Sequence, residues 1–355
     1  MPPHLLDHSL ADLEARMREW GEPPFRARQI ARWALRRCAT SFEEMTDLPA
    51  ALRPRLAAEW TLAPPPVLAE TRADDGATSK VLLDLGGGAA IEAVRMDYDP
   101  DRPEHAQGSR ARSTICVSTQ AGCAMACVFC ATGQQGFTRN LTAGEILAQV
   151  LHFQRERPIS NVVFMGMGEP LANYDPTLAS VRWLIDRDGL DLRARGVTIS
   201  TVGLPGAIRR LAGEGLQIGL TVSLHAPDDE LRRQLIPTAG GVTLDELTEA
   251  SNDYVERTGR RVTYAYALLE RLNDEPEQAR RLASRIRGTR CHVNLIPYNP
   301  TAGEGLRRPS LSRVRAFQRE LQAAGVNATV RIERGVEIAA ACGQLRTDHL
   351  AASAR

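Results

Sequence analysis

The chain has 355 residues, a formal net charge of +1 at pH 7 and 43% hydrophobic residues. That length suits one large α/β domain with a smaller one beside it, and the near-neutral charge does not point to a polyanion partner. Its seven cysteines are clustered rather than spread in pairs, which excludes a disulfide scaffold and favours metal or redox chemistry in a reducing compartment. No stretch resembles a signal peptide or a membrane span, so we expect a cytoplasmic protein with no membrane partner.

Residues 1–63 are predicted to form a small helical domain, because apolar residues recur there at helical spacing. Arg28, Arg32 and Arg36 recur every four residues and would line one face of its second helix. A charged face of this kind is usually only solvated. If the protein binds folded RNA, this face is the first candidate to contact phosphates.

Residues 64–112 are predicted to be a linker and a β-hairpin, since three prolines open the region and two apolar stretches, 79–85 and 89–96, flank three glycines. The polar residues 97–112 are expected to form a loop. Lys80 is the only lysine of the chain. A GC-rich genome suffices to explain so strong a preference for arginine.

Residues 113–355 alternate strand-like and helical segments, which predicts a parallel sheet. Six such units indicate an α/β fold with a partial, open (β/α)6 barrel, whose ligands bind at the carboxyl ends of the strands. A further strand is expected at 327–333. The six strands are expected at 113–119, 161–166, 196–201, 218–224, 261–268 and 292–297, with helices near 142–157, 177–187, 205–213, 228–235, 244–258 and 275–287.

Three cysteines, Cys123, Cys127 and Cys130, follow the first of these strands. A structural zinc site usually has four ligands in two pairs, and no second pair is present here. Three cysteines with an open fourth position suit a 4Fe-4S cluster that offers one iron to a ligand, and Phe129 would shield it. Zinc remains the alternative.

Further polar residues follow the ends of the other strands. Gly168 and Glu169 form a pattern that alone indicates only a tight turn. His225, taken singly, is more often a hydrogen-bonded core histidine than a ligand. Because parallel strands end at one rim, the following residues are expected to lie together: Gly168, Glu169, Ser200, Ser223, Leu224, His225 and Asn299.

On these motifs the chain resembles the radical S-adenosylmethionine (SAM) enzymes, whose motif is Cys-x-x-x-Cys-x-aromatic-Cys, and among them the RlmN/Cfr family of RNA adenine methyltransferases. A weaker match at 25–33 and 41–53 extends the resemblance over nearly the whole chain. The matching stretches are CVSTQAGCAMACVFCATGQQGFTRNL (116–141), NVVFMGMGEPLANYD (161–175), SLHAPDD (223–229), NLIPYNP (294–300) and RGVEIAAACGQL (334–345).

The resemblance implies a partial barrel of the radical SAM type, carrying the methyl-carrier cysteine in a C-terminal extension, and an RNA-binding role for residues 1–63. It also implies a 4Fe-4S cluster on Cys123, Cys127 and Cys130. SAM would be held by Gly168, Glu169, Ser200, Ser223, Leu224, His225 and Asn299.

For catalysis the resemblance implies that Cys342 carries the methyl group, that Cys116 releases the product, and that Glu92 accepts a proton. Carbon 2 of adenine is not nucleophilic, so a radical route is needed, and both cysteines must act as nucleophiles. The alternative for any free cysteine is a small core residue, which suffices for Cys38 and Cys291. Strand alternation alone would place Glu92 in solvent.

The implied reaction is methylation at C2 of adenine 2503 in 23S rRNA and of an adenine in certain tRNAs, through S-methylcysteine and a transient disulfide. It requires an external electron donor and a disulfide reductant, and we expect a monomer. Methylation at C8, as in Cfr-type enzymes, is one alternative, although 134–137 looks more like the C2 group. A non-catalytic zinc-dependent RNA-binding module is the other. Two departures from the family pattern, Glu337 for aspartate and Ala265 for an acidic residue, do not involve the cysteines.

Overall fold

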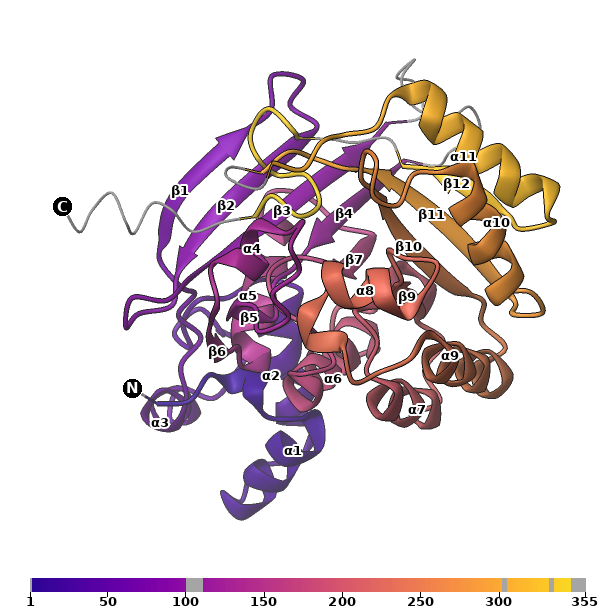
Figure 1. The fold of residues 1–355 in the computed structure, drawn as a ribbon. Helices are drawn as coiled ribbons and strands as arrows, with labels where there is room; N and C mark the ends of the chain where they lie inside the picture. The colour runs from indigo at the N-terminus through magenta and orange to yellow at the C-terminus, as the bar shows by residue number, and fades with distance from the viewer. Residues whose placement is uncertain (1, 100–110, 302–304, 332–334, 346–355) are drawn as a thin grey trace.

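The structure is a computed structural model that describes residues 2–99, 111–301, 305–331 and 335–345. Its centre is a ten-stranded sheet with the order β1-β2-β3-β4-β7-β8-β9-β10-β11-β12. Figure 1 shows this sheet as a curved wall with helices along its outer side and loops on its inner side. The predicted α/β fold with a partial barrel is therefore confirmed.

The barrel strands pair in parallel from β4 to β12. They fall where the apolar runs predicted them, and β12 adds the expected further strand beside β11. Their bounds are β4 Arg112–Cys116, β7 Asn161–Phe164, β8 Val197–Thr201, β9 Gly219–Ser223, β10 Val262–Leu268, β11 Cys291–Pro297 and β12 Ala328–Val330.

Helices connect these strands at the predicted places, and local sequence fixes their starts. Thr142 and Thr243 each form a capping box with a glutamate three residues later. Helix α11, which precedes β12, was not predicted. No helix in the described ranges is both long and apolar enough to cross a membrane. The bounds are α5 Ala143–Gln154, α6 Tyr174–Ile185, α7 Pro205–Gly213, α8 Asp229–Leu235, α9 Leu244–Thr258, α10 Pro276–Arg285 and α11 Leu311–Ala323.

An antiparallel edge extends the sheet beyond β4. Strands β2 (Thr78–Asp84) and β3 (Ala90–Tyr98) form the predicted hairpin, and β1 (Val67–Arg72), which the sequence did not indicate, pairs with β2. Strand β3 pairs antiparallel with β4, so the hairpin is continuous with the barrel wall. Most of the predicted loop at 97–112 lies outside the described residues.

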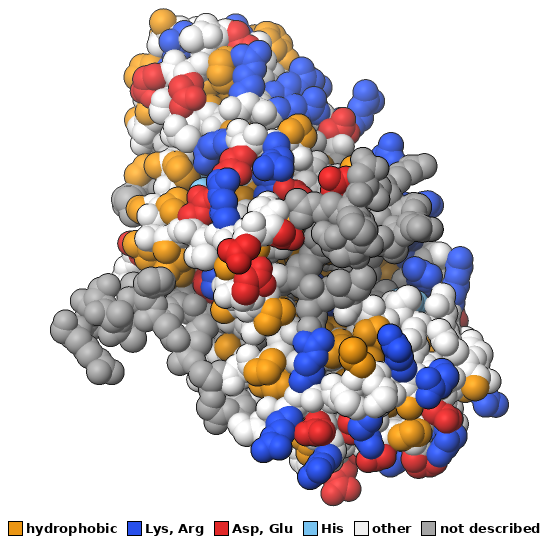
Figure 2. Space-filling view, turned by 90° about the horizontal axis from the view of Figure 1, so that it is seen from above, with side chains coloured by type: hydrophobic (Ala, Val, Ile, Leu, Met, Phe, Trp, Pro, Cys, Tyr) orange, Lys and Arg blue, Asp and Glu red, His pale blue; other side chains and the backbone are white. Residues whose placement is uncertain are grey.

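The N-terminal helices are α1 (Leu10–Glu19), α2 (Phe25–Leu35) and α3 (Leu52–Glu59), preceded by the short helix η1 (Leu5–Asp7). They pack below α5 and α6 in Figure 1. The Asp7 carboxylate accepts a hydrogen bond from the Gly144 N–H at 2.7 Å, at the start of α5. Figure 2 shows basic and acidic side chains interspersed on the face seen from above.

Candidate active site

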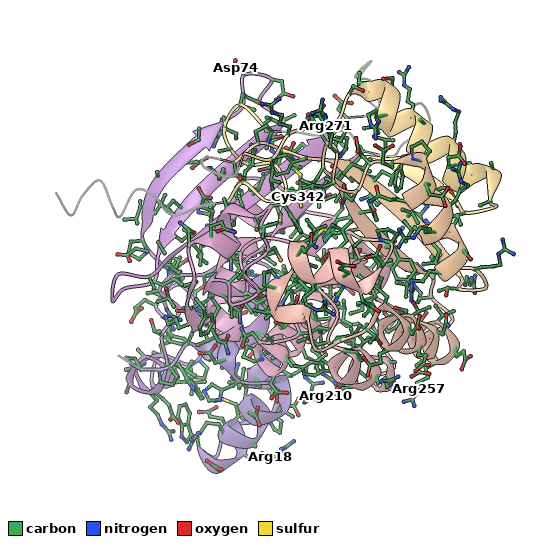
Figure 3. The ribbon with its side chains drawn as sticks, in the orientation of Figure 1. Arg18, Asp74, Arg210, Arg257, Arg271 and Cys342 are labelled. Carbon is green, nitrogen blue, oxygen red and sulfur yellow. The ribbon has the colours of Figure 1, made fainter. Side chains whose placement is uncertain are left out.

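A cavity of about 160 Å³ opens at the carboxyl ends of the parallel strands. Its walls come from strand ends, from residues 123–130 after the short strand β5 (Gln120–Gly122), and from residues 335–345, called here the C-terminal segment. Figure 3 shows Cys342 of this segment inside the molecule, whereas Arg18 and Arg257 point outward. Among the residues singled out from the sequence, the cavity is lined by Cys123, Cys127, Cys130, Gly168, Glu169, Ser200, Ser223, His225, Asn299 and Cys342.

Leu224 does not share this position, because its side chain is buried in the main hydrophobic core. Its backbone N–H donates to the carbonyl of Ala265 at 3.0 Å. This residue therefore belongs to the wall of the barrel. Its side chain does not support the role in holding SAM that the resemblance implies for it.

Residues 123–130, the cysteine loop, require a glycine at their entrance. Gly122 has a φ of +73°, and a Cβ there would lie 2.0 Å from the carbonyl oxygen of Gly136. The same carbonyl accepts a hydrogen bond from the Cys123 N–H at 2.8 Å. The close approach of β5 and β6 (Phe137–Asn140) thus fixes the backbone position of Cys123, the first cysteine of the loop.

The three thiols of the cysteine loop share a buried, mutually repulsive environment. Burial raises the pKa of Cys123 to about 11, raises that of Cys127 well above its ordinary value, and raises that of Cys130. Charge on Cys130 raises the pKa of the other two further. Thiols with raised pKa values lose their protons readily only when a cationic group binds the thiolates. In the described residues, no three His, Cys, Asp or Glu side chains stand at the spacing of a single-ion site.

The carboxylate of Glu169 is buried at the cavity wall, where it accepts hydrogen bonds from the N–H groups of Leu171 at 2.9 Å and Val202 at 2.7 Å. Burial outweighs these bonds and raises the pKa of Glu169 to about 7. Gly168 beside it has a φ of +97°, and a Cβ there would lie 2.5 Å from the side chain of Gln120. A buried carboxylate at an open cavity is stabilised by a cationic partner such as an ammonium group.

His225 combines the two interpretations that its sequence position allowed. Its Nδ1 accepts a hydrogen bond from the Ala267 N–H at 2.8 Å, and burial lowers its pKa to about 3. The ring also lines the cavity and packs edge-on against Phe129, with ring centroids 4.7 Å apart. It is a hydrogen-bonded core histidine that supports the aromatic residue of the cysteine loop.

Asn299 faces both the cavity and Cys342. Its Nδ2 donates to the carbonyl of Cys342 at 3.2 Å. Its Oδ1 is buried and has no hydrogen-bond partner within the described part of the chain. A buried acceptor of this kind at a cavity wall is normally satisfied by a bound molecule. The residues therefore fit a cosubstrate that offers hydrogen-bond donors.

The C-terminal segment is bonded onto the residues that follow the cysteine loop. The Ala131 N–H donates to the carbonyl of Gly343 at 2.8 Å, and the Thr132 hydroxyl donates to the carbonyl of Leu345 at 2.7 Å. Both bonds are to residues that follow Cys342, and they hold the backbone next to it at the cavity. Residues far apart in the chain thus form one site.

Cys116 and Glu92 lie on one face of the sheet. Val94 of β3 pairs with Cys116 of β4, and Glu92, two residues before Val94, points to the same side. Burial raises the pKa of Cys116 to about 12, with a further contribution from Cys342, so the two thiols lie within electrostatic reach.

The expectation from alternation that Glu92 faces solvent is wrong, since Glu92 is only 4% exposed. The residues from Ala90 to Met96 in β3 are all buried, because this strand lies between β2 and β4 and is covered on both faces. Alternation identifies only strands that have one solvated face.

Sequence reasoning assigned no role to Lys80, which lies beside Glu92. Its Nζ is 2.8 Å from Oε1 of Glu92, and its side chain is only 13% exposed. The signal available in the sequence was its status as the only lysine.

The arginines predicted to face phosphates are largely engaged within the protein. Arg32 pairs with Asp188 at 2.5 Å, and the Arg36 Nε donates to the carbonyl of Gly189 at 2.8 Å. Arg28 lies 3.8 Å from Glu14. Arg32 and Arg36 thus join α2 to the loop after α6, whereas Arg28 lies near α1.

Comparison with known proteins agrees with this arrangement. The family model described as the radical SAM superfamily matches residues 117–283, and the one described as the ribosomal RNA large subunit methyltransferase N-terminal domain matches residues 4–62.

Similar proteins extend over nearly the whole chain. "Ribosomal RNA large subunit methyltransferase N" of Nitrosopumilus maritimus is 47% identical over 343 residues, which cover 95% of this chain and 96% of that protein. "Probable dual-specificity RNA methyltransferase RlmN" of Chloroflexus aurantiacus is 47% identical over 361 residues, covering 97% and 93%. The crystal structure of a radical SAM methyltransferase from Sphaerobacter thermophilus has a TM-score of 0.89 and 47% identity, and the alignment covers 97% of this chain and 99% of that one.

Proposed function

Because the chain belongs to the RlmN family of radical SAM RNA methyltransferases, we propose that it methylates carbon 2 of adenine 2503 in 23S rRNA and an adenine in certain tRNAs. The relatives' names refer to ribosomal RNA and to dual specificity, which supports ribosomal RNA and a second kind of RNA as substrates. Such a protein would work in the cytoplasm, where its RNA substrates are. We expect it to act as a monomer.

We propose that Cys123, Cys127 and Cys130 hold a 4Fe-4S cluster. The chemistry that such a cluster would supply, when reduced, is the electron for cleavage of SAM and thus the radical route that carbon 2 of adenine requires. Glu169 would pair with the ammonium group of SAM, for which its buried carboxylate is suited. Ser200, Ser223, His225 and Asn299 would surround the nucleoside from the other strand ends.

Cys342 is proposed to receive a methyl group and to carry it to the adenine. Once the carbon is joined to the base, Glu92 would accept the proton from carbon 2. The Cys116 thiolate would then attack the sulfur of Cys342, so that a disulfide forms, the bond from this sulfur to carbon breaks, and the carbon left on the base takes up a proton to become the methyl group. An external reductant would reopen the disulfide, and a separate electron donor would serve the cluster.

The observation that carries this proposal is the attachment of the C-terminal segment to the end of the cysteine loop. A cluster-binding loop alone suits many reactions. A fourth cysteine held at the same cavity, with a fifth within electrostatic reach of it, gives the chain what a methyl carrier and its resolving thiol need. A non-catalytic zinc module has no use for either thiol.

The test is anaerobic reconstitution followed by iron and sulfide analysis, an absorption spectrum and mass spectrometry of RNA treated with the protein. We expect iron, sulfide and 2-methyladenine. Cys342→Ser should keep the iron and lose the methylation. Colourless protein that works without Cys342 would support the zinc module instead, and 8-methyladenine would overturn the assignment to carbon 2.

A further inference from the structure

Lys80 is largely buried, so it is not simply a charged side chain that faces solvent. It is the only lysine among 44 basic residues, and it lies in the middle of β2 with a side chain that is only 13% exposed. Arginine supplies every other basic side chain in the sequence. The two groups are not interchangeable in a confined space, because the ammonium is a compact donor with three hydrogens and the guanidinium is a planar fork.

Two contacts engage this ammonium group. Its Nζ lies 2.8 Å from Oε1 of Glu92 and donates to the carbonyl of Ala339 at 3.2 Å. In the β2–β3 register, Lys80 pairs with Val94 and Leu82 pairs with Glu92. Lys80 and Glu92 are therefore diagonal neighbours on one face of the sheet.

The same face carries Cys116 and supports the C-terminal segment. Val94 lies opposite Lys80 on one side and opposite Cys116 on the other, which places the backbones of Lys80 and Cys116 roughly 10 Å apart, at two strand spacings. A Cβ on Gly335 would lie 2.8 Å from the Thr78 Cγ2, and Thr78 precedes Lys80 by two residues. The segment thus packs directly on β2, and Lys80 is bonded across this contact.

We infer that Lys80 is a positioning residue that fastens the C-terminal segment to the sheet while it holds the carboxylate of Glu92. Ala339 is three residues before Cys342. One ammonium group therefore links the proposed proton acceptor to the backbone that carries the proposed methyl-bearing thiol. The catalytic consequence rests on the proposed function, whereas the structural link does not.

The link is tested by hydrogen exchange in the full chain. In Lys80→Met, amides of residues 335–345 should exchange about tenfold faster than in the wild type, since a hydrogen-bonded charged group has been removed. The matched control is Arg72→Met on the neighbouring strand β1. The Arg72 side chain is 57% exposed and pairs with Glu70 and Glu156. Exchange in this segment should be unchanged in the control. Unchanged exchange in Lys80→Met would overturn the inference.

The single lysine also allows a direct chemical probe of the ion pair. Acetic anhydride acylates amines and not guanidinium groups, so Lys80 is the one side-chain amine that it can acetylate. We expect acetylation of Lys80 to be about tenfold faster in Glu92→Gln than in the wild type, because loss of the charged partner frees the amine. Equal rates would show that Glu92 does not hold Lys80.

A third variant separates positioning from charge. Lys80→Arg keeps the charge but replaces the compact ammonium with a larger group, so we expect a wild-type unfolding temperature and several-fold slower methylation of Cys342. This rate is read as the gain in protein mass with SAM and no RNA. A wild-type rate in Lys80→Arg would show that charge alone suffices and would overturn the positioning role. If the wild-type protein gains no methyl group, the proposed function fails. Hydrogen exchange and acetylation still show whether Lys80 links Glu92 to the C-terminal segment.

Discussion

The N–H of Ala131 donates a hydrogen bond to the carbonyl of Gly343 at 2.8 Å. Ala131 directly follows Cys130, and Gly343 directly follows Cys342, so this bond joins the end of the cysteine loop to the thiol farthest along the chain. A Cβ on Gly343 would lie 3.4 Å from the carbonyl oxygen of Phe129, which shows how closely the two segments approach. This bond therefore brings the cysteine loop and the C-terminal segment together at one site.

Replacing Cys116 by Ala should trap RNA covalently on Cys342, because the carbon is still joined to the base but no thiol attacks the sulfur to release it. We expect release of methylated RNA to fall by at least about 10²-fold, the scale of a lost catalytic group. Denaturing electrophoresis and mass spectrometry of the protein–RNA adduct measure this. Cys291→Ala, on β11, is the matched control and should release RNA normally. Free, fully methylated RNA from Cys116→Ala would refute the assigned role.

The reactivity of Cys116 should depend steeply on pH. Burial raises its pKa to about 12, so the thiol keeps its proton at pH values where an ordinary cysteine has already lost it. Since only the thiolate is nucleophilic, alkylation of Cys116 in the cluster-free protein should rise about tenfold per pH unit from about pH 7 to about pH 10. Iodoacetamide labelling followed by peptide mass spectrometry checks this. A plateau near pH 9 would contradict the expectation.

Gly122→Ala should unfold the start of the cysteine loop. The new Cβ would lie 2.0 Å from the Gly136 carbonyl, at a φ of +73°, and we expect a loss of about 2–4 kcal/mol in the free energy of unfolding together with a lower iron content. Gly206→Ala in α7 is the control, since a Cβ there has no neighbour within 4 Å. It should be neutral or stabilising by up to about 1 kcal/mol. Denaturant unfolding and iron analysis compare the two.

Patterns in the sequence predicted the elements that repeat. The parallel strands β4, β7, β8, β9, β10 and β11 are short apolar runs, and each was found within a few residues of its predicted place. Strand β1 was missed because its residues are mostly exposed and lack a continuous apolar run. The short strands β5 and β6 were missed because their pairing depends on glycines and not on hydrophobicity.

The parts of the site that bring distant residues together were harder to predict. Motifs identified the residues at the cavity, but no pattern shows that Lys80 bonds to Ala339 or that Glu92 is buried. Both follow from strand register and from the path of the C-terminal segment, which are tertiary features. The ion pair of Arg32 could not be predicted for the same reason, since its partner Asp188 is remote in sequence.

The two ends of the Asn299 side chain should be separable by mutation. Its Oδ1 is buried and lacks a partner among the described residues, while its Nδ2 donates to the carbonyl of Cys342 at 3.2 Å. Asn299→Ala removes both ends, and we expect SAM to bind about 10- to 100-fold more weakly, the effect of losing a buried hydrogen bond worth about 1–3 kcal/mol.

Asn299→Asp keeps an acceptor at the proposed SAM contact but replaces the donor to Cys342 with an oxygen that repels the carbonyl. We therefore expect a smaller loss of SAM affinity than in Asn299→Ala and a greater loss in the rate at which Cys342 gains a methyl group. Calorimetry of SAM binding and the protein mass gain without RNA measure the two effects separately. Parallel losses of affinity and rate in both variants would show that Asn299 acts only on the cosubstrate, and that other bonds alone position Cys342.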